Sequence, residues 1–318
     1  MVVKRIPIPE PQAGEILVKI EAAGANFFDI LIIQGKYQVK PKLPFIPGSE
    51  FAGTVVRSND PKSSFKPGDR VFGSTTTGAY AEYTSIASDR LFLIPENLNF
   101  EEACGIYVTL PTSYAALKVR ADIKAGDVVL VLAAAGGVGI AAVQIAKAFG
   151  ATVISAVGSE EKFDICRKAG SDYVINYSNK NWTQEVLSIT KGKGADIIYD
   201  PVGRIGESLK CIAWNGRALV IGYAGGAIEN LMTNRVLLKN VSIVGVHWGA
   251  YYLNEKETVP KVWEGIFDLI SKGLLKPIVY QPVFNSLEQT NEALNTIASR
   301  KTFGKVVVKP GNSTESKL

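Results

Sequence analysis

Cysteine and histidine are scarce in this chain, and their scarcity limits the kinds of site it can build. The 318 residues include three cysteines, Cys104, Cys166 and Cys211, and one histidine, His247. Cysteines this few and this far apart provide neither a disulfide framework nor a CxxC zinc motif. We therefore expect free thiols in a reducing compartment.

Long apolar runs and a strong charge are also absent. No apolar run reaches the roughly 18 to 20 residues that a membrane helix needs. The beginning of the chain, MVVKRIPIPEPQAGE, lacks the apolar core of a secretory signal. The net charge of +5 is modest and the lysines are scattered, so neither a membrane nor nucleic acid is the expected partner. The length accommodates two domains of about 150 residues each.

The most informative segment that is present is VVLVLAAAGGVGIAAVQIAKAFGAT, residues 128–152. It begins with the apolar run of a strand buried on both faces and ends with the apolar spacing of a helix. Between them, Ala133, Gly136 and Gly139 form a variant of the glycine fingerprint, with alanine in the first position. This pattern predicts a turn of small residues, Ala135 among them, whose backbone can approach a phosphate.

The helix after this turn has no polar residue at its start. We expect the amides of Gly137, Val138 and Gly139, together with the helix dipole, to face the diphosphate of a dinucleotide. A second apolar strand, at 152–157, completes the strand–helix–strand unit that gives the fingerprint its meaning. The alternative is an ordinary tight turn between a strand and a helix.

The distribution of proline and glycine divides the chain into two regions. Residues 16–95 contain short strands separated by Pro and Gly, which predicts a β-rich domain. Alternating strands and helices then predict a parallel sheet covered on both faces, with strands at 128–132, 152–157, 173–176, 196–200, 218–223 and 242–248. Helices at 261–275 and 287–300 and a strand at 304–310 are expected to return to the first domain, with a substrate cleft at the junction.

Nine segments of the sequence, in their order and spacing, resemble those of one known protein family. They resemble the medium-chain dehydrogenase/reductase superfamily, in its zinc-free quinone oxidoreductase branch, the zeta-crystallin-like proteins; LLKNVSIVGVHWGAY (237–251) is most similar to the quinone oxidoreductase-like proteins. The segments are ANFFDILIIQGKY (25–37), LPFIPGSEFAG (43–53), PTSYAAL (111–117), AAAGGVG (133–139), GSEEK (158–162), YVINY (173–177), DPVG (200–203), WNGRALVIGYAGG (214–226) and GKVVV (304–308).

The resemblance implies an α/β protein with two domains. A GroES-like β-rich catalytic domain would comprise 1–110 and 250–318, and a Rossmann domain with a doubly wound parallel sheet would comprise 111–249. The resemblance also implies a homodimer. Metal-dependent relatives have a cysteine where this chain has Asn26, and GHE where it has Gly48, Ser49 and Glu50. We therefore expect hydride transfer without a metal.

The resemblance places Asn26 and Tyr37 at the nicotinamide end of the site. An amide can hold the nicotinamide or the acceptor oxygen, and a phenol can donate a proton to the developing oxyanion. Tyr37 could equally be an aromatic lid. Thr112 is expected to bond the nicotinamide amide or ribose, or else to cap a helix. Further contacts to the ribose and nicotinamide are expected from Val202, Gly222, Tyr223 and Ala224, with Trp248 as a pocket wall.

The residues after the second strand predict the choice of cofactor. NAD enzymes place a carboxylate there to hold the ribose diol, whereas this chain has Gly158 and Ser159. The family pattern would bring Lys162, Tyr177 and Arg300 to the 2′-phosphate of NADPH. Two nearby acids, Glu160 and Glu161, favour NADH mildly, but acids in a first helical turn are also explained by the helix dipole. We therefore expect NADPH.

Together these features predict an NADPH-dependent, metal-free reductase of quinones or related conjugated carbonyls. One alternative is an enone, alkenal or enoyl-thioester reductase. Another is a crystallin-like or RNA-binding nucleotide-binding protein without significant turnover, which only the sequence pI near 8.9 favours. The chain ends in Ser316, Lys317 and Leu318, a signal read by the peroxisomal import receptor, so we expect a peroxisomal or cytoplasmic location.

Overall fold

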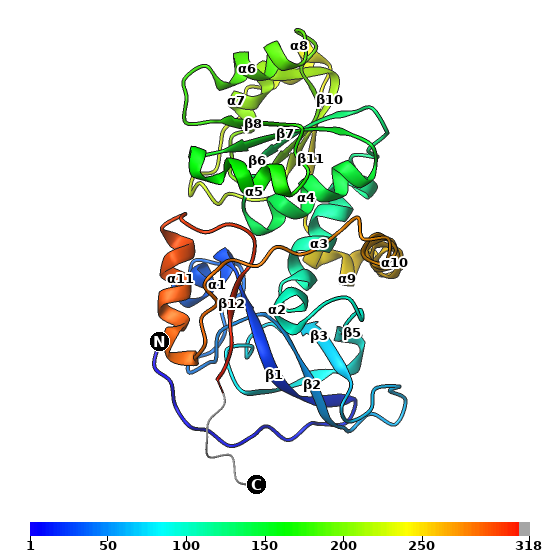
Figure 1. Ribbon diagram of the computed structural model, residues 1–318, viewed down its shortest axis with the longest axis vertical. Coiled ribbons are helices and arrows are strands. Elements are labelled where there is room, and N and C mark those ends of the chain that lie inside the picture. Colours follow the sequence, from blue (N-terminus) through cyan, green and yellow to red (C-terminus); the bar gives the residue numbers. More distant parts are fainter. Residues whose placement is uncertain (312–318) are drawn as a thin grey trace. The chain divides into compact units, whose positions relative to one another are not determined.

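The computed structural model describes residues 1–311, which form two compact units (Figure 1). Of the described residues, the first unit contains 1–108 and 277–311, and the second contains 109–276. Residues 316–318, the predicted import signal, lie outside the described residues. No helix within residues 1–311 is long and apolar enough to span a bilayer.

The sheet of the first unit is antiparallel, with the order β12-β1-β2-β3-β5, and β4 also pairs with β1. β12 pairs with β1 at Ala23–Ala25, so the strand predicted at 304–310 does return to the first domain. The sheet covers a core of buried apolar side chains from both ends of the chain. Its strands are β1 (Glu15–Ala25), β2 (Glu50–Ser58), β3 (Arg70–Ser74), β4 (Tyr83–Ala87), β5 (Leu91–Leu93) and β12 (Val306–Val308).

Few helices accompany this sheet. Asn26 caps the first of them: its backbone N–H donates to the Oδ2 atom of Asp29 over 2.9 Å, as in a capping box. The helix predicted at 287–300 packs against α1 and β12 and therefore also belongs to the first unit. The helices are α1 (Phe27–Ile33), η1 (Ser88–Arg90), α2 (Phe100–Ala103), η6 (Leu287–Gln289) and α11 (Thr290–Ala298); α3 (Ile106–Tyr114) begins in this unit and ends in the second.

The sheet of the second unit is parallel, with the order β11-β10-β9-β6-β7-β8. Connections from β6 run to β7 and β8 on one side, whereas β9 lies on the other side of β6, so the topological switch point lies between β6 and β9. The strands are β6 (Val128–Leu132), β7 (Thr152–Val157), β8 (Tyr173–Asn176), β9 (Ala195–Asp200), β10 (Ile212–Val220) and β11 (Ser242–Gly245).

Helices cover both faces of this sheet, as predicted (Figure 1). α4 (Gly137–Ala148) and α5 (Phe163–Lys168) lie on one face, and α6 (Trp182–Ile189), α7 (Ile205–Ser208) and α8 (Thr233–Lys239) lie on the other. The remaining helices are η2 (Ala115–Arg120, a π-helix), η3 (Glu160–Lys162), η4 (Leu209–Cys211), η5 (Trp248–Ala250), α9 (Tyr251–Asn254) and α10 (Thr258–Ser271).

Two expectations differ from the structure. Residues 250–276 were expected in the catalytic domain, but they pack in the second unit. A Cβ atom on Gly265 of α10 would lie 2.1 Å from the hydroxyl oxygen of Tyr114, and Gln144 of α4 exchanges hydrogen bonds with the backbone of Lys276. The strands predicted at 218–223 and 242–248 end at Val220 and Gly245; beyond them the chain leads into a turn at 224–225 and into η5 at Trp248.

Candidate functional site

The turn between β6 and α4 is held in a conformation that favours small residues. Ala133 has a φ of 47°, in the left-handed region, and its carbonyl accepts the Gly136 amide over 2.9 Å. A Cβ atom on Gly139 would lie 2.4 Å from the Ala133 carbonyl oxygen and 2.7 Å from the Cα atom of Ala134. The third position of the fingerprint therefore admits only glycine, because helix and strand pack closely there.

The turn presents backbone N–H groups at its surface. α4 begins at Gly137, and the amides of its first turn have no carbonyl four residues earlier within the helix. Gly136, Gly137 and Val138 are half-buried, whereas Ala135 is fully buried. The N-terminus of this helix, at the switch point of the sheet, is thus suited to an anionic group.

Helix α3 packs against this turn. The Ser113 hydroxyl donates to the carbonyl oxygen of Val138 over 2.9 Å and is also hydrogen-bonded, at 2.9 Å, to the phenol of Tyr199 in β9. Thr112, the neighbour of Ser113, is the seventh residue of α3 and does not cap it. The alternative of a helix cap for Thr112 is therefore wrong, and its expected contact with nicotinamide stays a prediction.

The segments after β9 and β10 are joined by backbone hydrogen bonds. Buried Asp200 accepts the amides of Val202 over 2.7 Å and Gly203 over 2.9 Å; burial raises the pKa of this carboxyl, and these hydrogen bonds oppose the rise. The Ala224 amide donates to the Pro201 carbonyl over 3.0 Å, and a Cβ atom on Gly203 would lie 3.0 Å from the Cδ1 atom of Tyr223. Gly222 lies in the same segment, so Val202, Gly222, Tyr223 and Ala224 lie close together at this edge; their contacts with ribose and nicotinamide stay predictions.

The turns after β7 and β8 also meet. The Ser178 hydroxyl donates to the Gly158 carbonyl over 3.0 Å, and a Cβ atom on Gly158 would lie 3.5 Å from the Tyr177 hydroxyl oxygen. No acidic side chain stands at Gly158 or Ser159. Lys162 is the last residue of η3, whose first turn contains the acids Glu160 and Glu161, as predicted.

Trp248, after β11, is the predicted wall of the nicotinamide pocket. It is 6% exposed, and its ring centroid lies 5.3 Å from that of Tyr251 and 5.8 Å from that of Tyr252. Its indole Nε1 atom is buried and lacks a hydrogen-bond partner within residues 1–311. A buried N–H without a partner is costly, so an acceptor atom on a ligand would stabilise it.

In the first unit, Asn26 belongs to a buried polar cluster. Lys305 and Glu50, which are 5% and 0% exposed, form an ion pair. The ammonium of Lys305 also donates to the Oδ1 atom of Asn26 over 2.7 Å, while the Asn26 Nδ2 atom donates to the Oε1 atom of Glu50 over 2.8 Å and, more weakly, to the Gly24 carbonyl over 3.4 Å. Hydrogen-bonding capacity remains mainly on the Oδ1 atom of Asn26, which can accept a second hydrogen bond.

Asp29 is 1% exposed and contacts this cluster through the backbone of Asn26. Its carboxylate accepts the phenol of Tyr80 over 2.8 Å, the hydroxyl of Ser49 over 2.9 Å and the backbone N–H of Asn26. Burial raises the pKa of Asp29, and the three hydrogen bonds and the charge of Lys305 oppose this rise. Asp29 is the third residue of α1, so these hydrogen bonds also fix the start of that helix.

Tyr37 and Arg300 are the other predicted site residues of the first unit. The ring of Tyr37 stacks on Phe28 with centroids 5.6 Å apart, and burial, followed by the charge of Asp29, raises the pKa of its phenol. Arg300 lies two residues beyond the last residue of α11, has a φ of 58° and is exposed. Its predicted contact with the 2′-phosphate stays a prediction, because Lys162 and Tyr177 belong to the second unit.

Two functional candidates were missed in the sequence. Lys305 lies in GKVVV, for which we predicted a strand but no functional side chain. Arg204 directly follows DPVG, for which we predicted a cofactor contact from Val202 but none from the arginine. A lysine between apolar strand residues is a signal for a buried ion pair, because such a charge needs a partner. No comparable local signal marks Arg204, whose partners are up to 27 residues away along the chain.

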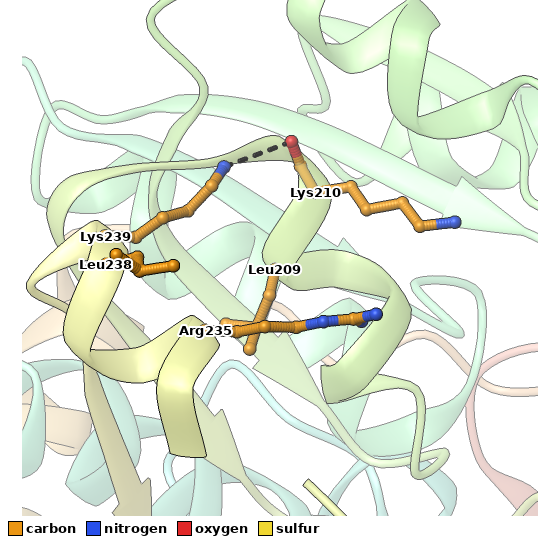
Figure 2. A pocket seen from close by; sticks show the side chains of 5 residues that line it. All are labelled: Leu209, Lys210, Arg235, Leu238 and Lys239. Atoms are coloured by element: carbon orange, nitrogen blue, oxygen red, sulfur yellow. Dashed lines mark hydrogen bonds between the residues drawn. The ribbon is translucent and has the colours of Figure 1, made fainter. Parts of the chain in front are cut away.

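A cavity of about 270 Å³ lies elsewhere in the second unit (Figure 2). It lies between η4 and α8, and its lining residues Leu209 and Lys210 shortly precede the start of β10, whereas the predicted dinucleotide residues follow strand ends. The lining is completed by Arg235, Leu238 and Lys239. This cavity does not coincide with the predicted cofactor residues.

Comparison with known proteins gives matches along both units. Residues 12–96 match the family model described as alcohol dehydrogenase GroES-like domain, and residues 137–270 match the one described as zinc-binding dehydrogenase. The chain is 37% identical to quinone oxidoreductase-like protein 2 of Mus musculus, covering 92% of this chain and 84% of that protein. It is 34% identical to the quinone oxidoreductase of Homo sapiens, covering 95% and 91%.

Solved structures agree with these matches. The quinone oxidoreductase of Escherichia coli, crystallised with NADPH, aligns with a TM-score of 0.88 at 31% identity, covering 97% of this chain and 95% of that one. The quinone oxidoreductase of Thermus thermophilus aligns with a TM-score of 0.83 at 31% identity, covering 96% and 95%. The predicted resemblance and the two-domain fold are thus confirmed. The chain belongs to the medium-chain dehydrogenase/reductase superfamily, in its quinone oxidoreductase-like branch.

Proposed function

We propose that the chain is an NADPH-dependent reductase that transfers a hydride to quinones or related conjugated carbonyls. The observation that carries the proposal is the turn before α4, whose amides lie at the switch point of a parallel sheet. The Escherichia coli relative, with 31% identity, was crystallised with NADPH, which supports the same cofactor here.

The residues at this edge fit a dinucleotide. The amides of Gly137, Val138 and Gly139 would hold the diphosphate, and the lack of space for a Cβ atom at Gly139 keeps the backbone close to it. The turns at Val202 and Gly222–Ala224 and the indole of Trp248 would hold the ribose and nicotinamide. Reduced nicotinamide, when bound, supplies the hydride.

The preference for NADPH over NADH rests on the residues after β7 and β8. Gly158 and Ser159 offer no carboxylate to a ribose diol, and a 2′-phosphate would meet no acidic side chain at these two positions. Lys162 and the phenol of Tyr177 are the nearby donors in the second unit, and donors of this kind pair with a phosphate dianion. We include Arg300 in this set on the family pattern alone.

Asn26 and Tyr37 would have different roles near the hydride acceptor: Asn26 would accept a hydrogen bond, and Tyr37 would donate one. Because Lys305 and Glu50 fix the Asn26 amide, its free capacity is that of an acceptor, suited to a ribose hydroxyl or the nicotinamide amide. Stabilising a developing oxyanion requires a donor, which Asn26 in this orientation does not provide. Burial raises the pKa of Tyr37, which keeps the phenol protonated near neutral pH and able to donate.

We propose that the reaction needs no metal. The positions that correspond to metal ligands in relatives are occupied by an amide, Asn26, and a hydroxyl, Ser49, which is bonded to Asp29. Glu50 is paired with the Lys305 ammonium, and a second cation beside that ammonium would be repelled. Among residues 1–311, no group of three or more His, Cys, Asp or Glu side chains is placed to hold a metal ion. These residues do not fit zinc.

Oxidation of NADPH by a small quinone tests the proposal. We expect turnover with NADPH, at least about tenfold weaker kcat/KM with NADH, and no loss after dialysis against a chelator. Lys162→Gln should raise KM for NADPH more than for NADH, with Lys180→Gln, an exposed lysine of the same unit, as the control. No turnover with quinones or enones, despite bound NADPH, would contradict the proposal.

Reduction of an enone, alkenal or enoyl thioester is the second candidate, and the hydroxyl of Tyr37, whose ring is held against Phe28, favours it as a proton donor. These acceptors need a proton at carbon or oxygen, whereas a hydroquinone anion can take its proton from water. Tyr37→Phe keeps the ring that stacks on Phe28 and removes the hydroxyl. A loss of about 10²-fold in kcat on the enone alone would mark acid catalysis, and equal small losses on both acceptors would mark a lid.

We propose a homodimer as the assembled form. β11 is an edge strand of the parallel sheet, and neighbouring α8 exposes Leu237 and Leu238, which are 77% and 72% exposed. Exposed apolar side chains beside an open strand edge favour association with another chain. Sedimentation of wild type and of Leu238→Glu tests this: a dimer that dissociates in the variant supports the proposal, and a wild-type monomer contradicts it.

We further propose import into peroxisomes, with the cytoplasm as the alternative. The proposal rests on Ser316, Lys317 and Leu318 alone, which an import receptor would read. A fluorescent protein carrying the last twelve residues should enter peroxisomes and, after deletion of Leu318, remain in the cytosol. A diffuse distribution of both fusions would contradict import.

A further inference from the structure

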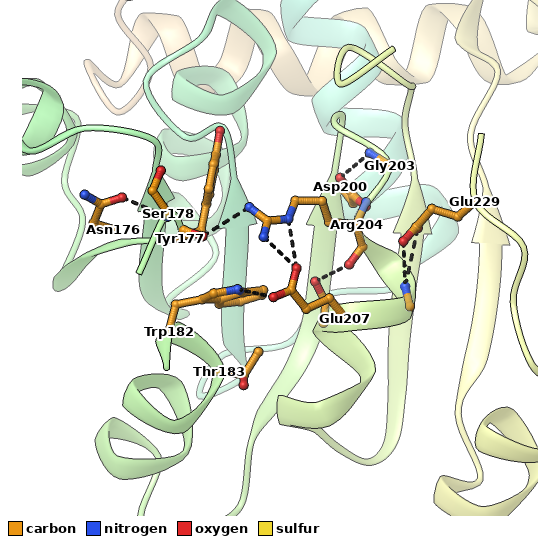
Figure 3. A network of polar contacts seen from close by, with 12 residues as sticks. Asn176, Tyr177, Ser178, Trp182, Thr183, Asp200, Gly203, Arg204, Glu207 and Glu229 are labelled. Carbon is orange, nitrogen blue, oxygen red and sulfur yellow. Dashed lines mark hydrogen bonds and ion pairs between the residues drawn. The ribbon is translucent and has the colours of Figure 1, made fainter. Parts of the chain in front are cut away.

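An arginine lies against two aromatic rings at the carboxyl end of β9 (Figure 3). The guanidinium carbon of Arg204 is 4.8 Å from the centre of the Tyr177 ring and 5.6 Å from that of Trp182. Its Nη1 atom donates to the backbone carbonyl of Tyr177 over 3.2 Å. Arg204 therefore contacts both the ring and the backbone of Tyr177.

Hydrogen bonds to two carboxylates fix the position of Arg204. Its Nε and Nη2 atoms donate to the Oε2 atom of Glu207 over 3.0 and 2.6 Å, and the Oε1 atom of Glu207 accepts the indole N–H of Trp182 over 2.8 Å. Its backbone N–H donates to the Oδ2 atom of Asp200 over 2.5 Å. Glu207 thus holds one edge of the guanidinium, and the rings of Tyr177 and Trp182 lie beside it (Figure 3).

Tyr177 is the residue through which this arrangement can reach a ligand. Its hydroxyl oxygen would lie 3.5 Å from a Cβ atom on Gly158, the position after the second strand where dinucleotide enzymes recognise the adenosine ribose. Glu207 largely neutralises the Arg204 charge, so long-range attraction of a phosphate by Arg204 is weak. The contribution of Arg204 must instead come from fixing the phenol.

We propose that Arg204 is a positioning residue for cofactor choice: it holds the Tyr177 phenol where that hydroxyl donates to the ribose 2′-phosphate. The inference rests on the proposed function. A fixed donor has lost its rotational freedom before binding, so more of the hydrogen-bond energy appears as affinity. Loss of Arg204 should then weaken binding of nucleotides that carry a 2′-phosphate and spare those that lack it.

Calorimetric titration with 2′,5′-ADP, 5′-AMP, NADPH and NADH tests the inference. Arg204→Lys keeps the charge and loses the guanidinium that contacts the two rings and donates twice to Glu207; we expect about 3- to 10-fold weaker 2′,5′-ADP and NADPH binding, with 5′-AMP, NADH and kcat at saturating NADPH within about twofold. Arg167→Lys is the control, because Arg167 also lies over a ring, Phe163, at 5.6 Å and pairs with a carboxylate three residues away.

A double-mutant cycle separates positioning from general support of the fold. If Arg204 acts through the phenol, Arg204→Lys should have little further effect on 2′,5′-ADP binding in a Tyr177→Phe background. Equal losses for 2′,5′-ADP and 5′-AMP, or additive losses in the cycle, would overturn the inference. A wild-type protein that binds 5′-AMP as tightly as 2′,5′-ADP would overturn the proposed preference for NADPH, and this inference with it.

Discussion

The two units differ in the polar groups that they offer to a ligand: buried side chains in the first unit and backbone amides in the second. In the first unit, Asn26, Glu50 and Lys305 are buried side chains that satisfy one another. At the carboxyl edge of the second unit, the groups are backbone amides of small, half-buried residues such as Gly137. Loss of one partner of a buried ion pair lowers the stability of the fold strongly, because the remaining charge has no partner. A backbone turn instead requires that no Cβ atom fill the space at its glycines. The two regions should therefore respond to different substitutions.

The largest effect is expected from Lys305→Met. This change leaves Glu50 as a buried charge without its cation and releases the Asn26 amide, so the free energy of unfolding should fall by about 3–5 kcal/mol. Denaturant unfolding measures it. The control is Lys147→Met, since Lys147 pairs with Asp172 at the surface over 2.8 Å and should cost less than about 1 kcal/mol. Similar losses in both variants would contradict the account.

The next largest effect is expected from Gly139→Ala. The new Cβ atom would lie 2.4 Å from the Ala133 carbonyl oxygen, so the turn must move, which costs about 1–3 kcal/mol. Titration with NADPH should reveal weaker binding, with the first unit unaffected in hydrogen exchange. Gly245→Ala is the control, because nothing lies within 4 Å of its Cβ position. Unchanged NADPH binding in Gly139→Ala would contradict a diphosphate contact at this turn.

A smaller, pH-dependent effect is expected at Asp29. Burial raises its pKa, so the folded state binds this proton more tightly than the unfolded chain does. Asp29 therefore contributes stability that is full below its unfolded pKa, about 3.9, and is lost as the pH rises through the folded pKa. Unfolding measured from acid to neutral pH should find that wild type loses stability relative to Asp29→Asn. Parallel curves for the two proteins would disprove the raised pKa.

The smallest effect is expected at the thiols, where the two units should not differ. Burial raises the pKa of Cys166 to about 11 and that of Cys211 to about 12, and it also raises the pKa of Cys104. Thiolate is then scarce near neutral pH, so iodoacetamide should neither label nor inactivate the folded protein. Denatured protein, labelled at all three sites, is the control. Rapid labelling of any one thiol in the folded state would be inconsistent with its burial.

The second unit could be predicted from the sequence more completely than the first. Its strands are local apolar runs, and 128–132, 152–157 and 173–176 match β6, β7 and β8 residue for residue. The position of 250–276 could not be predicted, because it depends on the contact of Gly265 with Tyr114, some 150 residues away. The pairing of Lys305 with Asn26 joins residues 279 positions apart; the local pattern around Lys305 indicates a buried charge that needs a partner, but it does not identify that partner.

Calorimetric titration of the purified chain with NADPH tests the central claim most directly. The account predicts binding of about one NADPH per chain, with Kd within the range of about 1 μM to 1 mM typical of enzyme ligands, weaker binding of NADH, and the same heats after removal of metal by a chelator. Absence of NADPH binding, or binding that requires a metal ion, would contradict the account.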